Sequence, residues 1–158
     1  PWKFVVVRQK NAELAKLAYG PNYDQVMEAP VTIALFTDTD LQKRARKIAR
    51  VGGVKNFTDE QLQYFMQSLP VEFARYDAQQ TSDYLALNAG LVAMNLVLAL
   101  TDQGIGTNII LGFDKSKINE VLGIEERFRP EVLITVGYAA EKVEPSYRLP
   151  VDEIIEKR

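Results

Sequence analysis

The strongest constraint on this chain is a long run without charge, from residue 84 to residue 100. The run is largely apolar and predicts a helix that protein covers on nearly all sides. It makes a poor membrane span, because it has 17 residues and a helix needs about 20 apolar residues to cross a bilayer. Ser82 lies just before the run and is the predicted N-cap. We therefore expect a long buried helix and no membrane partner.

Asn88 and Asn95 lie inside this run, two helical turns apart, so they share one face of the predicted helix. Buried amides need hydrogen-bond partners. Two explanations are open. Each amide bonds to neighbouring backbone, or the face forms a symmetric subunit contact or the rim of a cofactor site.

The composition limits the kinds of reaction that side chains of this chain could catalyse. A chain of 158 residues with 47% hydrophobic residues can build the core of a single domain. The chain contains neither Cys nor His, which excludes thiolate nucleophiles, imidazole bases and the usual zinc ligands. We predict no metal site and no catalytic side chain, so any redox chemistry would be carried by a cofactor.

The charge distribution gives no sign of a polyanionic partner. The formal net charge is -2, and basic residues gather only in a predicted helix at residues 41–50, which we interpret as a solvated face. We expect no nucleic-acid binding. The pattern of a secretory signal is not visible, so the expected location is cytoplasmic.

Short β-branched and apolar runs alternate with helical patterns, which indicates a mixed α and β domain. The predicted strands are residues 3–8, 31–37, 107–111 and 131–137. A helix beginning near Thr58 is expected to stop before Pro70. Residues 71–80 show no period and are predicted to form a mobile loop.

Several short motifs occur in the order found in one known family. They are Pro1-Trp2-Lys3-Phe4, Glu28-Ala29-Pro30-Val31, the Gly-Ile-Gly-Thr turn at 104–107, Gly112-Phe113-Asp114, Val136-Gly137-Tyr138 and Ser146-Tyr147-Arg148-Leu149-Pro150. Together with the long apolar helix, they resemble the nitroreductase-like flavoprotein family over essentially the whole chain. The resemblance implies an α+β, nitroreductase-like α/β sandwich with a central, mainly antiparallel sheet flanked by helices. It also implies a homodimer that binds FMN, with the long buried helix at the dimer interface.

The expected domain organisation is one nitroreductase-like domain over residues 1–158. In the family, a leading section with an Arg-x-Ser-type phosphate motif comes before the Pro-Trp pair. The chain begins at that pair, so we expect it to be N-terminally incomplete relative to the family.

The resemblance also implies where the cofactor lies. The family's flavin ring rests on a strand and turn whose backbone N–H lies near N5, where the hydride is gained and lost. A glycine in that turn lets backbone approach a planar ligand closely. Near the C-terminus the family has a phosphate-binding arginine, often with a second basic residue two positions earlier. The implied cofactor contacts in this sequence are Ile109, Ile110, Leu111, Gly112, Arg148 and Ser146, the last being uncharged.

The implied function is that of an FMN-dependent oxidoreductase. Hydride would pass from NAD(P)H through flavin N5 to a nitroaromatic, a quinone or a similar small-molecule acceptor. Phe73 or Tyr76, in the unpatterned segment, would line the acceptor pocket. The alternative is a non-catalytic or truncated flavin-binding dimer of the same fold.

Overall fold

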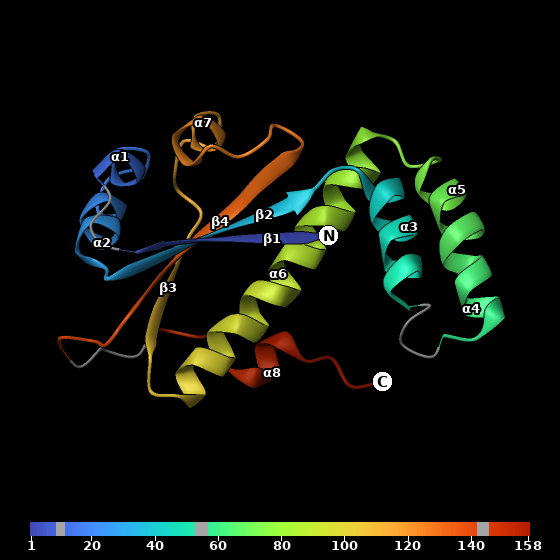
Figure 1. The fold of residues 1–158 in the computed structure, drawn as a ribbon. Coiled ribbons are helices and arrows are strands. Elements are labelled where there is room, and N and C mark those ends of the chain that lie inside the picture. Colours follow the sequence, from blue (N-terminus) through green and yellow to red (C-terminus); the bar gives the residue numbers. More distant parts are fainter. Residues whose placement is uncertain (9–11, 53–56, 142–145) are drawn as a thin grey trace.

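The computed structural model describes residues 1–8, 12–52, 57–141 and 146–158. Its centre is a four-stranded sheet in the order β1-β2-β4-β3, in which each neighbouring pair is antiparallel (Figure 1). The strands are β1 (Trp2–Arg8), β2 (Val31–Asp38), β3 (Gly106–Ile110) and β4 (Phe128–Gly137). The predicted antiparallel sheet is confirmed, and β4 begins three residues earlier than expected.

Helices cover both faces of the sheet (Figure 1). Successive residues of β2 point to opposite faces, as in any strand. Ala34 and Phe36 join a core with α1 (Ala12–Ala15), α2 (Asn22–Glu28) and α7 (Ile118–Leu122). Leu35 packs on the other face against α6 (Ala78–Asp102). The sheet therefore lies between two layers of helices.

The long helix α6 begins four residues before the predicted cap. Asp77 is its N-cap, because the Asp77 carboxylate accepts the N–H of Gln80 at 2.7 Å and the Gln80 side chain accepts the N–H of Asp77 at 3.0 Å. The hydroxyl of Ser82 instead accepts a hydrogen bond from the Arg129 guanidinium at 2.7 Å. The prediction of Ser82 as the cap was wrong because Asp77 and Gln80 together satisfy two free N–H groups of the first turn.

The helix before Pro70 does not stop at that residue. It runs as α4 (Asp59–Gln63), a π-helical turn η1 (Tyr64–Ser68) and α5 (Leu69–Phe73). The N–H of Leu69 bonds to the carbonyl oxygen of Tyr64, five residues back. Pro70 lies in the first turn of α5, where a missing N–H costs little. The predicted loop at 71–80 is also wrong, since most of it belongs to α5 and α6.

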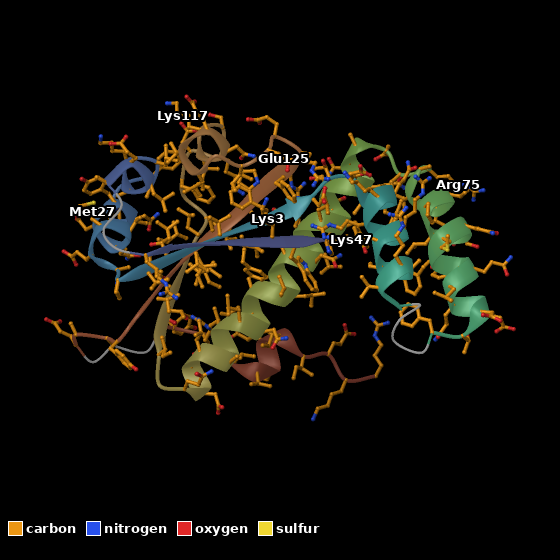
Figure 2. All side chains as sticks on the ribbon, in the orientation of Figure 1. Lys3, Met27, Lys47, Arg75, Lys117 and Glu125 are labelled. Carbon is orange, nitrogen blue, oxygen red and sulfur yellow. The ribbon has the colours of Figure 1, made fainter. Side chains whose placement is uncertain are left out.

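With α3 (Leu41–Gly52), these segments form a helical arm beside the sheet, marked by Lys47 and Arg75 in Figure 2. The arm joins the sheet at Asp38, whose side chain is buried at the end of β2. The Asp38 carboxylate accepts a hydrogen bond from Nε of Arg44 at 2.9 Å. It also forms an ion pair with Nη1 of Arg127 at 3.5 Å. This cluster ties α3 to the sheet.

Only one face of α6 is covered within a single chain. Leu85, Ala89 and Ala93 are buried against the sheet. On the outer face, the side chains of Leu87, Leu91, Met94 and Leu98 are all more than half exposed. Among the described residues, α6 is the one helix that is long and apolar enough to cross a membrane, a criterion that core helices of globular proteins also meet.

The two asparagines of α6 have different surroundings. Asn88 donates its amide to the carbonyl oxygen of Tyr84 at 2.8 Å, so the neighbouring-backbone explanation is confirmed for this residue. Asn95 is exposed and lines an open hollow of about 280 Å³ between α6 and Phe4 of β1.

Candidate functional site

The turn after β3 is fixed to the helices on one side of the sheet. The carbonyl oxygen of Gly112 accepts the N–H of Tyr19 at 2.9 Å and the Asn22 side-chain amide at 3.2 Å. Two residues on, the N–H of Asp114 donates to the carbonyl oxygen of Leu17 at 2.8 Å. The chain between residues 112 and 114 is therefore held rigidly against residues 17–22.

Gly112 presents a free donor in this turn. The N–H of Phe113 bonds to the carbonyl oxygen of Leu111 at 3.2 Å, closing a tight turn around Gly112. Within the described part of the chain, the N–H of Gly112 has no acceptor. A Cβ at this position would lie 3.1 Å from Nδ2 of Asn22, tighter than ordinary contact, so the position favours glycine.

The predicted ring-contact residues divide between core and surface. Ile110 is 2% exposed and belongs to the core under α1 and α7, so only its backbone can face a ligand. Ile109 is 38% exposed and Leu111 is 67% exposed. The turn thus offers two apolar side chains beside one unpaired N–H group, a surface suited to a flat, partly polar ligand.

The predicted phosphate contacts lie on a separate segment just before α8 (Val151–Ile154). Ser146 and Arg148 are both exposed. The Arg148 guanidinium donates one hydrogen bond, from Nη1 to the carbonyl oxygen of Tyr147 at 2.9 Å. Among the described residues, no hydrogen bond or ion pair joins this segment to the Gly112 turn, so the single chain does not link the two groups.

A buried polar network near the turn was not predicted from the sequence. Glu131 accepts hydrogen bonds from the Thr37 hydroxyl at 2.5 Å and from Nε of Arg129 at 2.8 Å, and it is 8% exposed. The Arg129 guanidinium also donates hydrogen bonds to the hydroxyl and the carbonyl oxygen of Ser82 on α6. Together with Lys115 and Ser116, which follow the turn, the network lines an open hollow of about 490 Å³.

The sequence signal for this network was the Arg-Pro-Glu triplet at 129–131. Proline inside a strand is typical of a bulge or an edge. The pairing of β2 with β4 does shift register here, between Leu35 and Phe36, so Glu131 has no partner across the ladder. A bulge redirects a side chain, and here Glu131 joins the buried network.

The suggested acceptor-pocket residues lie at the junction of the arm with α6. Phe73 ends α5, and Tyr76 lies between α5 and α6. Their ring centroids are 5.6 Å apart, and those of Phe73 and Tyr84 of α6 are 5.4 Å apart. The three rings form one aromatic cluster where α5 meets α6, with Phe73 and Tyr84 on helices and Tyr76 in the short connection between them, whereas we had expected a mobile loop.

The carboxylate of Asp114 is held in its charged form. Hydrogen bonds from the Ser116 hydroxyl at 2.6 Å and its backbone N–H at 3.0 Å, followed by Lys117, keep the pKa of Asp114 below its ordinary value. In the described ranges, no group of three His, Cys, Asp or Glu side chains is placed to hold a metal ion.

Comparison with protein families decides the identity of this fold. The model of the nitroreductase family matches residues 1–138. This chain belongs to the nitroreductase family. The match contains the whole sheet and the Gly112 turn. The predicted resemblance and the prediction of an oxidoreductase are thereby confirmed.

Individual relatives of this nitroreductase-family chain carry nitroreductase names as well. A Streptococcus pyogenes protein named "Putative NAD(P)H nitroreductase Spy0809" is 62% identical over 158 residues, which is 100% of this chain and 78% of the relative. A crystal structure of a nitroreductase family protein from Streptococcus pneumoniae TIGR4 is 84% identical, with a TM-score of 0.96 over 100% of this chain and 79% of that one. The predicted nitroreductase-like α+β fold is confirmed.

One further structural neighbour was solved with a cofactor. It is described as "a putative nitroreductase in complex with FMN", from Exiguobacterium sibiricum 255-15. It is 29% identical, with a TM-score of 0.88 over 100% of this chain and 77% of that one.

Proposed function

We propose that this chain is an FMN-dependent oxidoreductase that takes hydride from NAD(P)H and delivers it to a nitroaromatic, a quinone or a similar small acceptor. Family membership over residues 1–138 is the observation that carries the proposal. The FMN complex of a structural neighbour and the NAD(P)H nitroreductase name of a close sequence relative support it. When bound, FMN supplies hydride acceptance and donation at N5, a chemistry that needs no Cys or His from the protein.

The Gly112 turn fits the flavin ring. Its unpaired N–H can donate to a ring nitrogen without any titratable side chain. Ile109 and Leu111 are exposed beside it and can cover apolar ring surface. Hydrogen bonds from residues 19 and 22 hold the turn in place. We therefore assign the ring contacts to residues 109–112, through backbone at Ile110 and Gly112.

The C-terminal segment fits a phosphate. Arg148 uses one nitrogen for a carbonyl oxygen, and within the described residues its other guanidinium N–H groups have no acceptor. A guanidinium fork is matched to a phosphate dianion. Ser146 adds a hydroxyl donor two residues earlier. We assign both residues to the FMN phosphate.

The exposed face of α6 supports a homodimer. Leu87, Leu91, Met94 and Leu98 form an apolar strip, which we call the α6 strip, on a helix without charge between residues 84 and 100. The hollow between α6 and Phe4 continues this apolar surface onto β1. A second copy of the chain would bury the α6 strip in an apolar interface. Interfaces of obligate dimers are typically apolar and resemble the core of a domain divided between two subunits. We favour this partner over lipid because the uncharged run has 17 residues, fewer than the about 20 that a membrane span needs, and because the exposed Asn95 lies within it.

The visible absorbance spectrum of the purified protein, before and after denaturation, tests the cofactor. Bound flavin released as FMN is the expected result. Steady-state oxidation of NADH and NADPH with a nitroaromatic and a quinone then tests turnover. Bound FMN without turnover would support the non-catalytic alternative. A protein that stays colourless after addition of FMN would contradict the proposed function.

A further inference from the structure

The helix α3 carries a block of positive charge that the proposed cofactor site does not use. Residues 41–50 include five basic residues and no acidic one, whereas the whole chain has a formal net charge of -2, so the rest of the chain is net acidic. Four of these basic side chains are exposed, and we call them the α3 cations: Lys43, Arg46, Lys47 and Arg50. Among the described residues, only the fifth, Arg44, forms an ion pair, with Asp38.

The arrangement of the α3 cations is unfavourable for the helix itself. Lys43 and Lys47 are four residues apart, as are Arg46 and Arg50, and like charges at this spacing destabilise a helix. Lys43 also lies in the first turn of α3, which contains no acidic residue and where the helix dipole disfavours a cation. Stability therefore does not explain this concentration of charge. A surface field of one sign is suited to attracting a ligand of the opposite sign.

The arm leaves the sheet at the end that carries the Gly112 turn. The strand β2 leads into α3 (Figure 1), and its last residue, Asp38, pairs with Phe128 at the start of β4. Arg129, the next residue of β4, lines the hollow of about 490 Å³ together with Lys115, which follows the Gly112 turn. At 1.5 Å per residue, the 12 residues of α3 extend roughly 18 Å from the end of β2. Any ligand that approaches the turn therefore passes through the field of α3 at low salt, where the Debye length is about 30 Å.

The hydride donor of the proposed reaction carries phosphates. NADPH differs from NADH by one phosphate monoester, which adds about -1.5 to -2 charge at pH 7. A positive field therefore raises the local concentration of NADPH more than that of NADH. We propose that the α3 cations attract NAD(P)H through its phosphates and give this chain a preference for NADPH. The inference rests on the proposed function, because it concerns the nucleotide that this function consumes.

A small anion fits this charge better than a polyanion does. The positive surface is confined to one helix, and binding of a nucleic acid would need a basic surface that continues along its length. The net acidic remainder of the chain would repel such a polymer. The α3 cations stay in solvent and act through their field, so this role agrees with their interpretation as a solvated face.

A triple variant tests the field directly. Lys43→Gln, Arg46→Gln and Lys47→Gln together remove three of the α3 cations, and we expect the folded state to survive because Gln is a good helix former. The matched control retains the charges and exchanges the head groups: Lys43→Arg, Arg46→Lys and Lys47→Arg. A field depends on charge, whereas a bidentate contact distinguishes Arg from Lys.

The first measurement is the ratio of kcat/KM for NADPH to kcat/KM for NADH. Loss of folded or FMN-loaded protein cancels from this ratio. We expect wild type to favour NADPH at about 0.01 M salt, and the Gln variant to lower the ratio about fourfold, for three charges that act across on the order of 15 Å of water. The effect should shrink to less than about twofold at about 0.15 M salt, where the Debye length is about 8 Å.

The charge-retaining control should keep the wild-type ratio at both salt concentrations. A Gln variant with the wild-type ratio at low salt would overturn the inference, as would a wild type that favours NADH. A changed ratio in the charge-retaining control would also overturn it, because a direct contact and not a field would then be responsible.

The second measurement needs no turnover. In the ¹⁵N-labelled chain at low salt, the backbone amide resonances of α3 should shift more on addition of NADP⁺ than of NAD⁺, and the Gln variant should lose this difference. Equal shifts with the two nucleotides in wild type would contradict the attraction. Failure of wild type to oxidise either reduced nucleotide would instead contradict the proposed function, and the titration would still decide whether α3 attracts the additional phosphate.

Discussion

Trp2 donates its indole N–H to the main-chain carbonyl oxygen of Asn88, 3.1 Å away, and so ties the first residues of β1 to the middle of α6. Trp2→Phe keeps the aromatic bulk and removes this donor. We expect the free energy of unfolding to fall by about 1 kcal/mol, measured by urea denaturation followed by circular dichroism. Tyr138→Phe, at a largely exposed ring, should leave the free energy unchanged. Equal stability of Trp2→Phe and wild type would show that the bond contributes nothing.

Breaking the buried network at the bulge is expected to lower the free energy of unfolding by more than Trp2→Phe does. Glu131→Ala leaves the Arg129 guanidinium and the Thr37 hydroxyl without their shared acceptor. Breaking a buried ion pair by removing one partner costs roughly 3–5 kcal/mol of stability. We expect a loss near the lower end of this range for Glu131→Ala, because the Arg129 side chain is partly exposed. Thr37→Val, which removes only the hydroxyl, should cost about 1 kcal/mol. The expected order of urea midpoints is wild type, Thr37→Val, then Glu131→Ala, and a reversed order would contradict this account.

The end of β4 is packed too closely for a side chain at Gly137. A Cβ there would lie 2.9 Å from Cδ of Pro30. Overpacking of this kind typically costs about 1–3 kcal/mol, so Gly137→Ala should lower the thermal midpoint. In a Pro30→Ala background the same substitution should cost less, because the clashing ring is absent. An equal cost in both backgrounds would mean that the strain has another source.

The proposed homodimer predicts a specific effect of charge on the α6 strip. Leu91→Lys places a charge where the side chain is 63% exposed in one chain but would be buried by a second copy. We expect analytical ultracentrifugation to show a dimer for wild type and a monomer for this variant. Val71→Lys on the arm, at a residue that is 53% exposed, should remain dimeric. A monomeric wild type would remove the dimer from the proposal.

Asp114 predicts a pH dependence at the turn. Its pKa is lower in the folded chain than the ordinary value of 3.8, mainly because of the Ser116 hydroxyl. A lowered folded-state pKa gives stability that is present above the unfolded value and is lost as the pH falls through the folded one. Ser116→Ala should raise the pKa of Asp114, measured by NMR titration of its carboxyl carbon. It should also reduce the loss of stability on acidification below the ordinary value. No change in that pKa would refute the assignment of its cause.

Local patterns in the sequence were enough for the strands, the long helix and the family. Val- and Ile-rich runs predicted the four strands because β-branched residues pack well on a pleated surface. Pro70 and Ser82 misled the prediction of helix boundaries for a physical reason. Proline is tolerated in a first turn, and a cap depends on which nearby side chain reaches the free N–H groups.

Only the tertiary structure decided which residues far apart in the chain come into contact. The sequence pointed to Gly112, but not to Asn22, which lies 90 positions away and meets it only because α2 packs beside the turn after β3. Likewise, Glu131 joins Thr37 and Arg129 only because a bulge redirects its side chain. Periodicity records which face of an element is apolar. It carries no information on which two faces meet, because that depends on the packing of the whole chain.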